Sequence, residues 1–459
     1  MSETETNRRA ALLVATLASF LFPFMGGAAN VAVPVIGTEF RADVTALNWI
    51  VTAFIVVSAM GALPFGRLAD IVGRKRMFLA GTAVLGLGTL LCVPATSLPL
   101  LIAARAVQGV GAALLAGTAP AILISVYPPQ ERGRVLGIQT AAVYAGLAAG
   151  PVLGGVLTHW FGWRSVFLFS LVVTELTWLT ARTRLVGEWA EARGERFDRL
   201  GAVLCAAAVG LLTVGVTLLK SWAFAPWLTG AGVAALALFV WHESRTAQPI
   251  LDVRLLRRNR MFAMSNLAAL ISYAATFAAT YLLSLYLQVA RGLGPQAAGG
   301  LMLAGPVVQA ALSPWAGRLS DRVAPRLVAS AGMTLCTVAL GGLALIGRTT
   351  PLPLVVAVVM LLGAGFALFS SPNTNAVMSS VDRRMYGVAA ATLGTVRQVG
   401  MTLSMALVTV VLTLHLGRAP VTPAVADPLV AAMRIAFMIF ALLCLLGVPA
   451  SLARGRSNR

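Results

Sequence analysis

Fourteen long apolar stretches, separated by short polar segments, constrain this chain more than any other feature. A helix needs about 20 predominantly apolar residues to cross the hydrocarbon core of a bilayer. Because a membrane offers no partner for unpaired backbone groups, we expect an all-α integral membrane protein. The predicted spans lie near residues 11–35, 47–66, 77–96, 99–124, 135–158, 164–181, 200–219, 225–241, 262–288, 296–316, 327–346, 352–375, 387–413 and 432–452.

Composition and the placement of charge support this assignment. Charged residues make up 11% of the chain, whereas a typical soluble domain has about 25%. Basic residues gather in alternate gaps between the stretches, and the positive-inside rule then places both termini in the cytoplasm. The net charge of +19 therefore does not indicate nucleic-acid binding. Arg8 and Arg9 precede a first stretch that is too long for a signal-peptide core, so we expect it to remain as a span.

A charged, glycine-containing turn occurs once in each half of the chain. GRLADIVGRKR occupies residues 66–76, and GRLSDR occupies residues 317–322. This recurrence indicates two related membrane bundles in parallel orientation, an arrangement typical of transporters. Asp70 and Arg74 can pair at the helix end as a latch that forms in one conformation only, and Gly66 and Gly73 permit close approach. Asp321 is the counterpart in the second copy. The alternative is a tight charged stop between two helices.

The same evidence gives a domain organisation. We expect a cytoplasmic N-terminal tail over residues 1–10 and a first six-helix bundle over 11–181. Residues 182–260 would hold cytoplasmic loops and two extra spans, 261–453 a second six-helix bundle, and 454–459 a cytoplasmic tail.

Further motifs carry a resemblance to a known family. RAVQGVG occupies residues 105–111, Gly146, Gly150, Pro151, Gly154 and Gly155 follow in the fifth stretch, and FDRLG (197–201) and PILD (249–252) flank the two extra spans. With the turn at 66–76, the chain resembles the fourteen-span drug:proton antiporter branch of the major facilitator superfamily. The resemblance implies two six-helix bundles plus two inserted helices, and export of amphipathic organic compounds by proton antiport through alternating access.

One position departs from that branch. Its members usually carry an acidic residue in the first helix, a few residues before an Asn-x-Ala-x-Pro sequence. Asn30, Ala32 and Pro34 are present here, but the upstream position is Met25. The departure puts cationic-drug specificity and the branch's proton pathway in doubt. It favours an alternative, a carrier of a nutrient, organic acid or lipid that runs inward or outward, with or without proton coupling.

The glycines of the fifth stretch have a direct physical reading. Gly146, Gly150 and Gly154 are four residues apart and share one helix face, which lets another helix pack closely. Pro151 removes a backbone hydrogen bond and favours a bend. We expect Gly150 and Pro151 to shape a gating interface, and ordinary tight packing is the alternative.

Charged residues inside spans are functional candidates because they are costly to bury in a membrane. Arg397 lies near mid-bilayer, either as a cavity group or as a structural hydrogen-bond hub. Arg105 and Glu175 are the candidates for proton coupling, since a desolvated carboxyl group can bind and release protons near neutral pH. Arg105 can instead snorkel to the outer headgroups, and Glu175 can reach the interface near Arg182.

Uncharged polar residues inside spans can line a substrate cavity or form hydrogen bonds between helices. With Arg397, the candidates for the cavity are Asn30, Gln139, Tyr144, Asn373, Asn375 and Gln398.

The sequence does not predict an enzyme. Its three histidines, at 159, 242 and 415, are far apart, and no metal-ligand or nucleophile arrangement is evident. No phosphate-binding loop is present, so we expect no cofactor and a proton gradient as the energy source. The expected partners are a small amphipathic substrate and the lipid bilayer of a bacterial cytoplasmic (inner) membrane, with the protein working as a monomer. A receptor or scaffold without transport is a remaining alternative.

Overall fold

The structure is a computed structural model that describes residues 3–218, 222–251, 253–381, 386–417 and 422–454. Within these ranges the fold is helical without strands, and fourteen helices are long and apolar enough to cross a membrane. This confirms the predicted fold class and span count.

The chain is divided into two sets of six spans with a pair of helices between them. The first set is α1 (Glu3–Phe40), α2 (Val44–Val72), α3 (Arg74–Cys92), α4 (Leu98–Val126), α5 (Pro129–Phe161) and α6 (Arg164–Arg184). The inserted pair is α7 (Arg199–Leu218) and α8 (Ala225–Arg245). The second set comprises α9 (Val253–Arg258), α10 (Arg260–Thr276), α11 (Ala279–Leu285), the π-helix η1 (Tyr286–Ala290), α12 (Pro295–Met302), α13 (Ala304–Arg322), α14 (Pro325–Ala344), α15 (Leu352–Ser379), α16 (Tyr386–Leu416), the 3₁₀ turn η3 (Pro423–Val425) and α17 (Ala426–Leu452).

The two sets pack in the same pattern. In the first, α1 packs against α5 and α6, α3 packs against α4 and α6, and α2 packs against α4. In the second, α10 packs against α16 and α17, α14 packs against α15 and α17, and α13 packs against α15. Since corresponding helices occur in the same order along the chain, the halves form a parallel repeat, as the recurring turn indicated.

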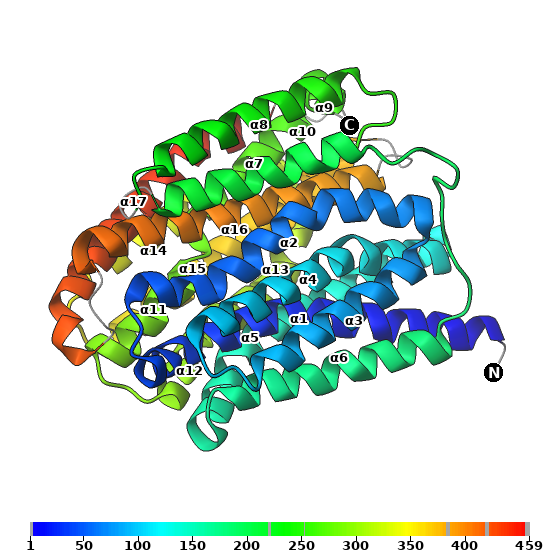
Figure 1. Cartoon of the computed structure of the whole chain (residues 1–459). Coiled ribbons are helices and arrows are strands. Elements are labelled where there is room, and N and C mark those ends of the chain that lie inside the picture. Colours follow the sequence, from blue (N-terminus) through cyan, green and yellow to red (C-terminus); the bar gives the residue numbers. More distant parts are fainter. Residues whose placement is uncertain (1–2, 219–221, 252, 382–385, 418–421, 455–459) are drawn as a thin grey trace.

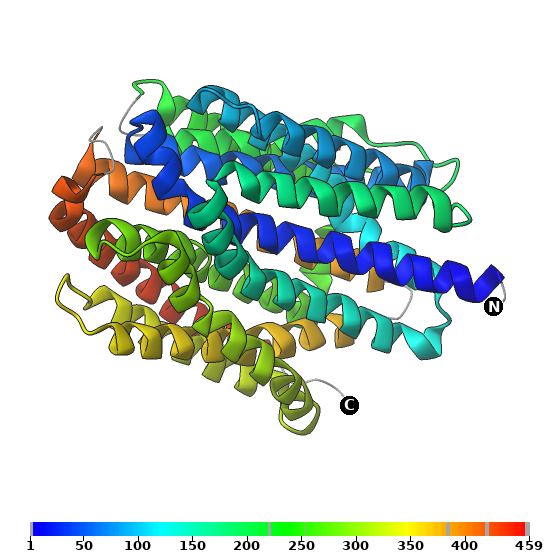
Figure 2. The same ribbon diagram turned by 90° about the horizontal axis from the view of Figure 1, so that it is seen from below.

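The halves meet through two corresponding helix pairs, α2 with α16 and α5 with α12. The inserted helix α7 packs against both α2 and α16, and α8 packs on α7 at one side of the bundle (Figure 1). Figure 2 shows the helices of both halves running along the same long axis. The α2–α3 turn (residues 72–74), the start of α1 and the linker 185–198 lie together at one end (Figure 1). We call this the turn end and its opposite the far end.

Candidate functional site

A cavity of about 1150 Å³ lies between the two halves. Residues of α1, α5, α10, α11, α13, α15 and α16 form most of its wall, which is largely apolar. Binding sites for drug-sized ligands commonly enclose about 300–1,000 Å³, with apolar walls and a few polar groups. The cavity is therefore large enough for a small organic molecule.

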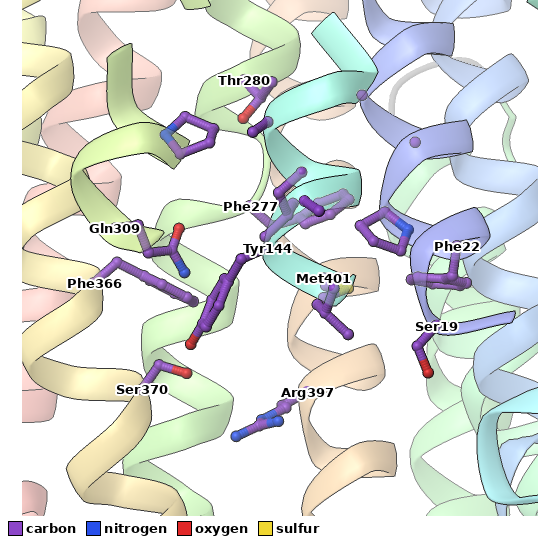
Figure 3. Close-up of a pocket in the computed structure, with 18 of the residues that line it drawn as sticks. Ser19, Phe22, Tyr144, Phe277, Thr280, Gln309, Phe366, Ser370, Arg397 and Met401 are labelled. Carbon is purple, nitrogen blue, oxygen red and sulfur yellow. The ribbon is translucent and has the colours of Figure 1, made fainter. Parts of the chain in front are cut away.

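Arg397 of α16 is the single charged residue among the described residues that line this cavity. Its Nη2 donates a hydrogen bond to Thr374 Oγ1 at 2.6 Å, and its guanidinium lies 5.5 Å from the centre of the Tyr273 ring. Its Nε is buried and has no hydrogen-bond partner among the described residues. Figure 3 shows the guanidinium in the cavity on the side of Ser370, with the Tyr144 hydroxyl directed toward the same region.

The other predicted cavity residues divide into two groups. Asn30, Gln139, Tyr144, Asn375 and Gln398 line the cavity. Asn373 does not, because it is 1% exposed and packed between helices, whereas its neighbour Thr374 reaches the wall. In this polar segment of α15 the sequence prediction holds for Asn375 and is wrong for Asn373.

The cavity is closed toward the far end by contacts between the two halves. Ser284 Oγ donates to the carbonyl oxygen of Asn30 at 2.7 Å, and Gln288 Nε2 donates to that of Val31 at 3.0 Å. Beside them α5 and α12 approach so closely that a Cβ on Gly299 would lie 2.1 Å from the Pro151 carbonyl oxygen. Movement of one half against the other must separate these groups.

The glycine face of α5 packs as the sequence predicted, and its partner is α1. A Cβ on Gly146 would lie 2.4 Å from Phe20 O, and one on Gly154 would lie 2.6 Å from Ala28 Cα. Gly150 likewise faces Phe24 O and Gly27 Cα. These contacts are within one half, whereas the carbonyl oxygen of Pro151 faces Gly299 of the other half. Their role in gating stays a prediction.

At the turn end Asp70 and Arg74 form an ion pair of 2.9 Å. The Arg74 side chain is nearly buried, and it also donates to Ser125 Oγ at 2.7 Å and to Glu191 at 2.7 Å. Gly66 lies against Gly117 of α4, where a Cβ on Gly117 would be 3.0 Å from Gly66 Cα. The predicted pair therefore forms, but within a larger network. The side chain of Asp321, its predicted counterpart, lies outside the described residues.

The network includes three glutamates of the linker 185–198 that sequence reasoning missed. Glu195 pairs with Arg67, Glu191 with Arg74 at 2.7 Å, and Glu188 with Arg76 at 3.7 Å. Glu188 also accepts hydrogen bonds from the backbone N–H groups of residues 75 and 76. Gly73 has φ +128°, and a Cβ there would lie 2.5 Å from the Glu188 carboxylate. The sequence signal that could have indicated this contact is the match between three acidic residues in the linker and three arginines in the turn.

The two candidates for proton coupling lie outside the cavity lining. Arg105 is fully buried within the first half, where Nε donates to Ile50 O at 3.0 Å and Nη1 donates to Gln108 Oε1 at 2.7 Å. Its guanidinium lies 4.4 Å from the centre of the Phe54 ring, so it does not snorkel outward. Glu175 is exposed on α6, beside Gly86 of α3. Met25 of α1, which stands where the resembled branch usually has an acidic residue, does line the cavity.

Comparison with known proteins assigns the family. The model of the Major Facilitator Superfamily matches residues 15–405. The chain belongs to this superfamily. It is a multi-pass transporter and not an enzyme.

This transporter is similar to proteins that are named for different functions. It is 32% identical over 387 residues to multidrug resistance protein Stp of Mycobacterium tuberculosis, covering 82% of this chain and 71% of Stp. It is 34% identical over 404 residues to cephamycin export protein CmcT of Amycolatopsis lactamdurans, covering 85% and 82%. It is 29% identical over 398 residues to riboflavin transporter RibZ of Clostridioides difficile, covering 86% of each. A solved structure of a peptide transporter, POT, with sulfate has the same fold, with a TM-score of 0.69 at 16% identity, covering 96% of this chain and 94% of that one.

Proposed function

We propose that this transporter exports small amphipathic organic compounds by alternating access, in exchange for protons. The cavity between the two halves carries the proposal, because it is closed at the far end by contacts that a relative movement of the halves would break. The apolar wall with a few polar groups suits an amphipathic molecule. The relatives named for multidrug resistance and cephamycin export support an export direction.

The network at the turn end and the contacts at the far end are both formed in this structure, and the proposed transition separates the far-end contacts. Arg74, Asp70 and the linker glutamates stabilise one arrangement of the turn end, and separating them would accompany the transition. A bistable contact of this kind is what a two-state transporter requires. We also propose that the protein resides in the bacterial cytoplasmic membrane, which its similarity to bacterial transporters supports.

The test is uptake of a panel of dyes and antibiotics into inside-out membrane vesicles energised by a pH gradient, with Glu175→Gln beside the wild type. We expect wild-type uptake that an uncoupler abolishes. Loss of uptake in the variant would assign the proton site to Glu175, whereas unchanged uptake would keep export and remove Glu175 from the coupling mechanism. No gradient-dependent uptake of any compound would contradict proton-driven export.

A metabolite carrier is the second candidate. Met25 replaces the usual acidic residue in the cavity wall, and one relative is named a riboflavin transporter. Facilitated flux of a vitamin or organic acid that persists without a pH gradient would favour this candidate.

A further inference from the structure

The charge of the cavity wall indicates the charge of the molecule that the cavity binds. Among the described lining residues Arg397 is cationic and none is acidic. A charge held inside a membrane protein needs a counter-charge or water, because desolvation of an unpaired ion is costly. We propose that the substrate is an amphipathic organic anion and that Arg397 binds its anionic group. This inference rests on the proposed function, since it takes the cavity as the substrate site.

The contacts of Arg397 with the described residues include no counter-charge. Its guanidinium donates a hydrogen bond to a neutral hydroxyl, that of Thr374, and lies against the ring of Tyr273. Tyr273 is in turn held edge-on by Phe366, with ring centres 5.2 Å apart. These neighbours fix the orientation of the guanidinium and do not neutralise it. A guanidinium has five N–H donors in a planar fork, which matches a carboxylate or phosphate.

Further donors surround the same part of the cavity. Gln309 of α13 has a buried Nε2 without a partner among the described residues, and it lines the wall. Figure 3 shows Gln309, Tyr144, Ser370 and Arg397 around one region of the cavity. Neutral donors of this kind can complete the hydrogen bonds of a bound oxyanion.

The remainder of the wall indicates what is attached to the anionic group. Phe22, Phe277 and Met401 line the cavity away from Ser370 (Figure 3). Apolar and aromatic side chains favour an apolar body, which would bury against them while its charge meets Arg397. A cation would meet the like charge of Arg397 without an acidic partner in the described wall, so the site discriminates against it.

The test is direct binding to the purified full-length protein in neutral detergent. The probes are a radiolabelled naphthyl carboxylate, its neutral methyl ester and the trimethylammonium analogue. We expect the carboxylate to bind most tightly, and Arg397→Gln to weaken its binding about 10- to 100-fold, the effect of losing a charge-assisted hydrogen-bond partner. Arg397→Lys retains the charge and should recover part of the affinity.

Arg434→Gln is the matched control, because Arg434 of α17 donates to Ala344 O and does not line the cavity. It should leave carboxylate binding unchanged. Equal or tighter binding of the cationic analogue, or no binding of the carboxylate, would overturn the inference. Competition by phosphatidylglycerol would keep the anion site and assign it to a lipid headgroup.

Flux of the same probes in inside-out vesicles separates this inference from the proposed function. Export of the ester or the cation, with no carboxylate binding, would leave an exporter of another substrate class. Carboxylate binding that depends on Arg397, with no flux of any probe in vesicles, would leave the anion site and contradict export.

Discussion

Arg74 has two carboxylate partners whose different exposure predicts different energetic weights. The side chain of Asp70 is 35% exposed, and that of Glu191 is 68% exposed. Water screens the more exposed pair, so we expect Glu191→Gln to lower the free energy of unfolding by less than about 1 kcal/mol. Asp70→Asn should lower it by about 1–3 kcal/mol, because it weakens charge-assisted bonds to a nearly buried guanidinium. Denaturant unfolding of the purified protein in detergent would measure both.

A second ion pair at the turn end provides a control. Arg8 and Glu131 form a partly exposed ion pair of 3.4 Å that shares no residue with the turn network, so Glu131→Gln should have little effect on stability. A cost for Glu191→Gln equal to that for Asp70→Asn would show that the linker contact is as strong as the contact within the turn.

At the level of single residues, the sequence predicts how deep a residue lies in the membrane better than which way its side chain points. Arg397 and Glu175 both stand well inside apolar stretches, yet Arg397 lines the cavity and Glu175 is exposed on α6. The hydropathy pattern locates a residue along its membrane span, but it does not determine which face of the helix meets the other half. Asn373 and Thr374 illustrate the same limit, since one step of about 100° along a helix separates the buried from the lining position.

At the level of helices, the contact between α5 and α12 predicts the effect of one methyl group. A Cβ on Gly299 would overlap the Pro151 carbonyl oxygen at 2.1 Å, whereas a Cβ on Gly300 would have no neighbour within 4 Å. We expect Gly299→Ala to push α12 away from α5 and disfavour closure of the far end by about 1–3 kcal/mol, as in other overpacked contacts. Gly300→Ala is the matched control and should have no such effect.

Spin labels at Trp160→Cys and Ala297→Cys, exposed positions near the ends of these helices, would report the distance between them. Gly299→Ala should shift the distance distribution to longer values, and Gly300→Ala should not. An unchanged distribution in both variants would contradict a role for this contact in closing the far end.

The spacing of glycines in α5 predicted close packing but not the partner of each glycine. Gly146, Gly150 and Gly154 recur on one face and meet α1, whereas Gly155 lies against Pro295 of α12. The linker glutamates were missed for a related reason. A loop has no periodicity, so its register against the α2–α3 turn depends on tertiary contacts that the sequence does not encode locally.

For the whole molecule, the sequence predicted the fold well, because span length and the recurring turn are strong constraints. It did not predict that the first span of the second half is divided into α10, α11 and the π-helix η1. Phe277 and Thr280 of this divided span line the cavity. Such breaks place side chains at the cavity wall, and hydropathy alone still scores the segment as one apolar stretch.

The charge of the cavity also predicts how transport responds to the membrane potential. If the substrate is an anion, its export moves negative charge out of the cell, and proton entry would move positive charge inward. Both movements are driven by an inside-negative potential, worth about 2.3 kcal/mol per charge at 100 mV. We therefore expect electrogenic transport whether or not protons are coupled.

Inside-out vesicles with a potassium diffusion potential test this expectation. A lumen-positive potential, without a pH gradient, should drive uptake of the naphthyl carboxylate, and Arg397→Gln should abolish this uptake. A pH gradient with the potential clamped by valinomycin and equal potassium should drive uptake only if protons are exchanged. Potential-driven uptake alone would describe a uniporter for anions, which needs no acidic residue in the cavity wall and so accounts for Met25. Carboxylate uptake that did not depend on the membrane potential would contradict electrogenic transport, because it would mean that a co-transported cation neutralises the anion. The described residues of the cavity wall include no carboxylate that could bind such a cation.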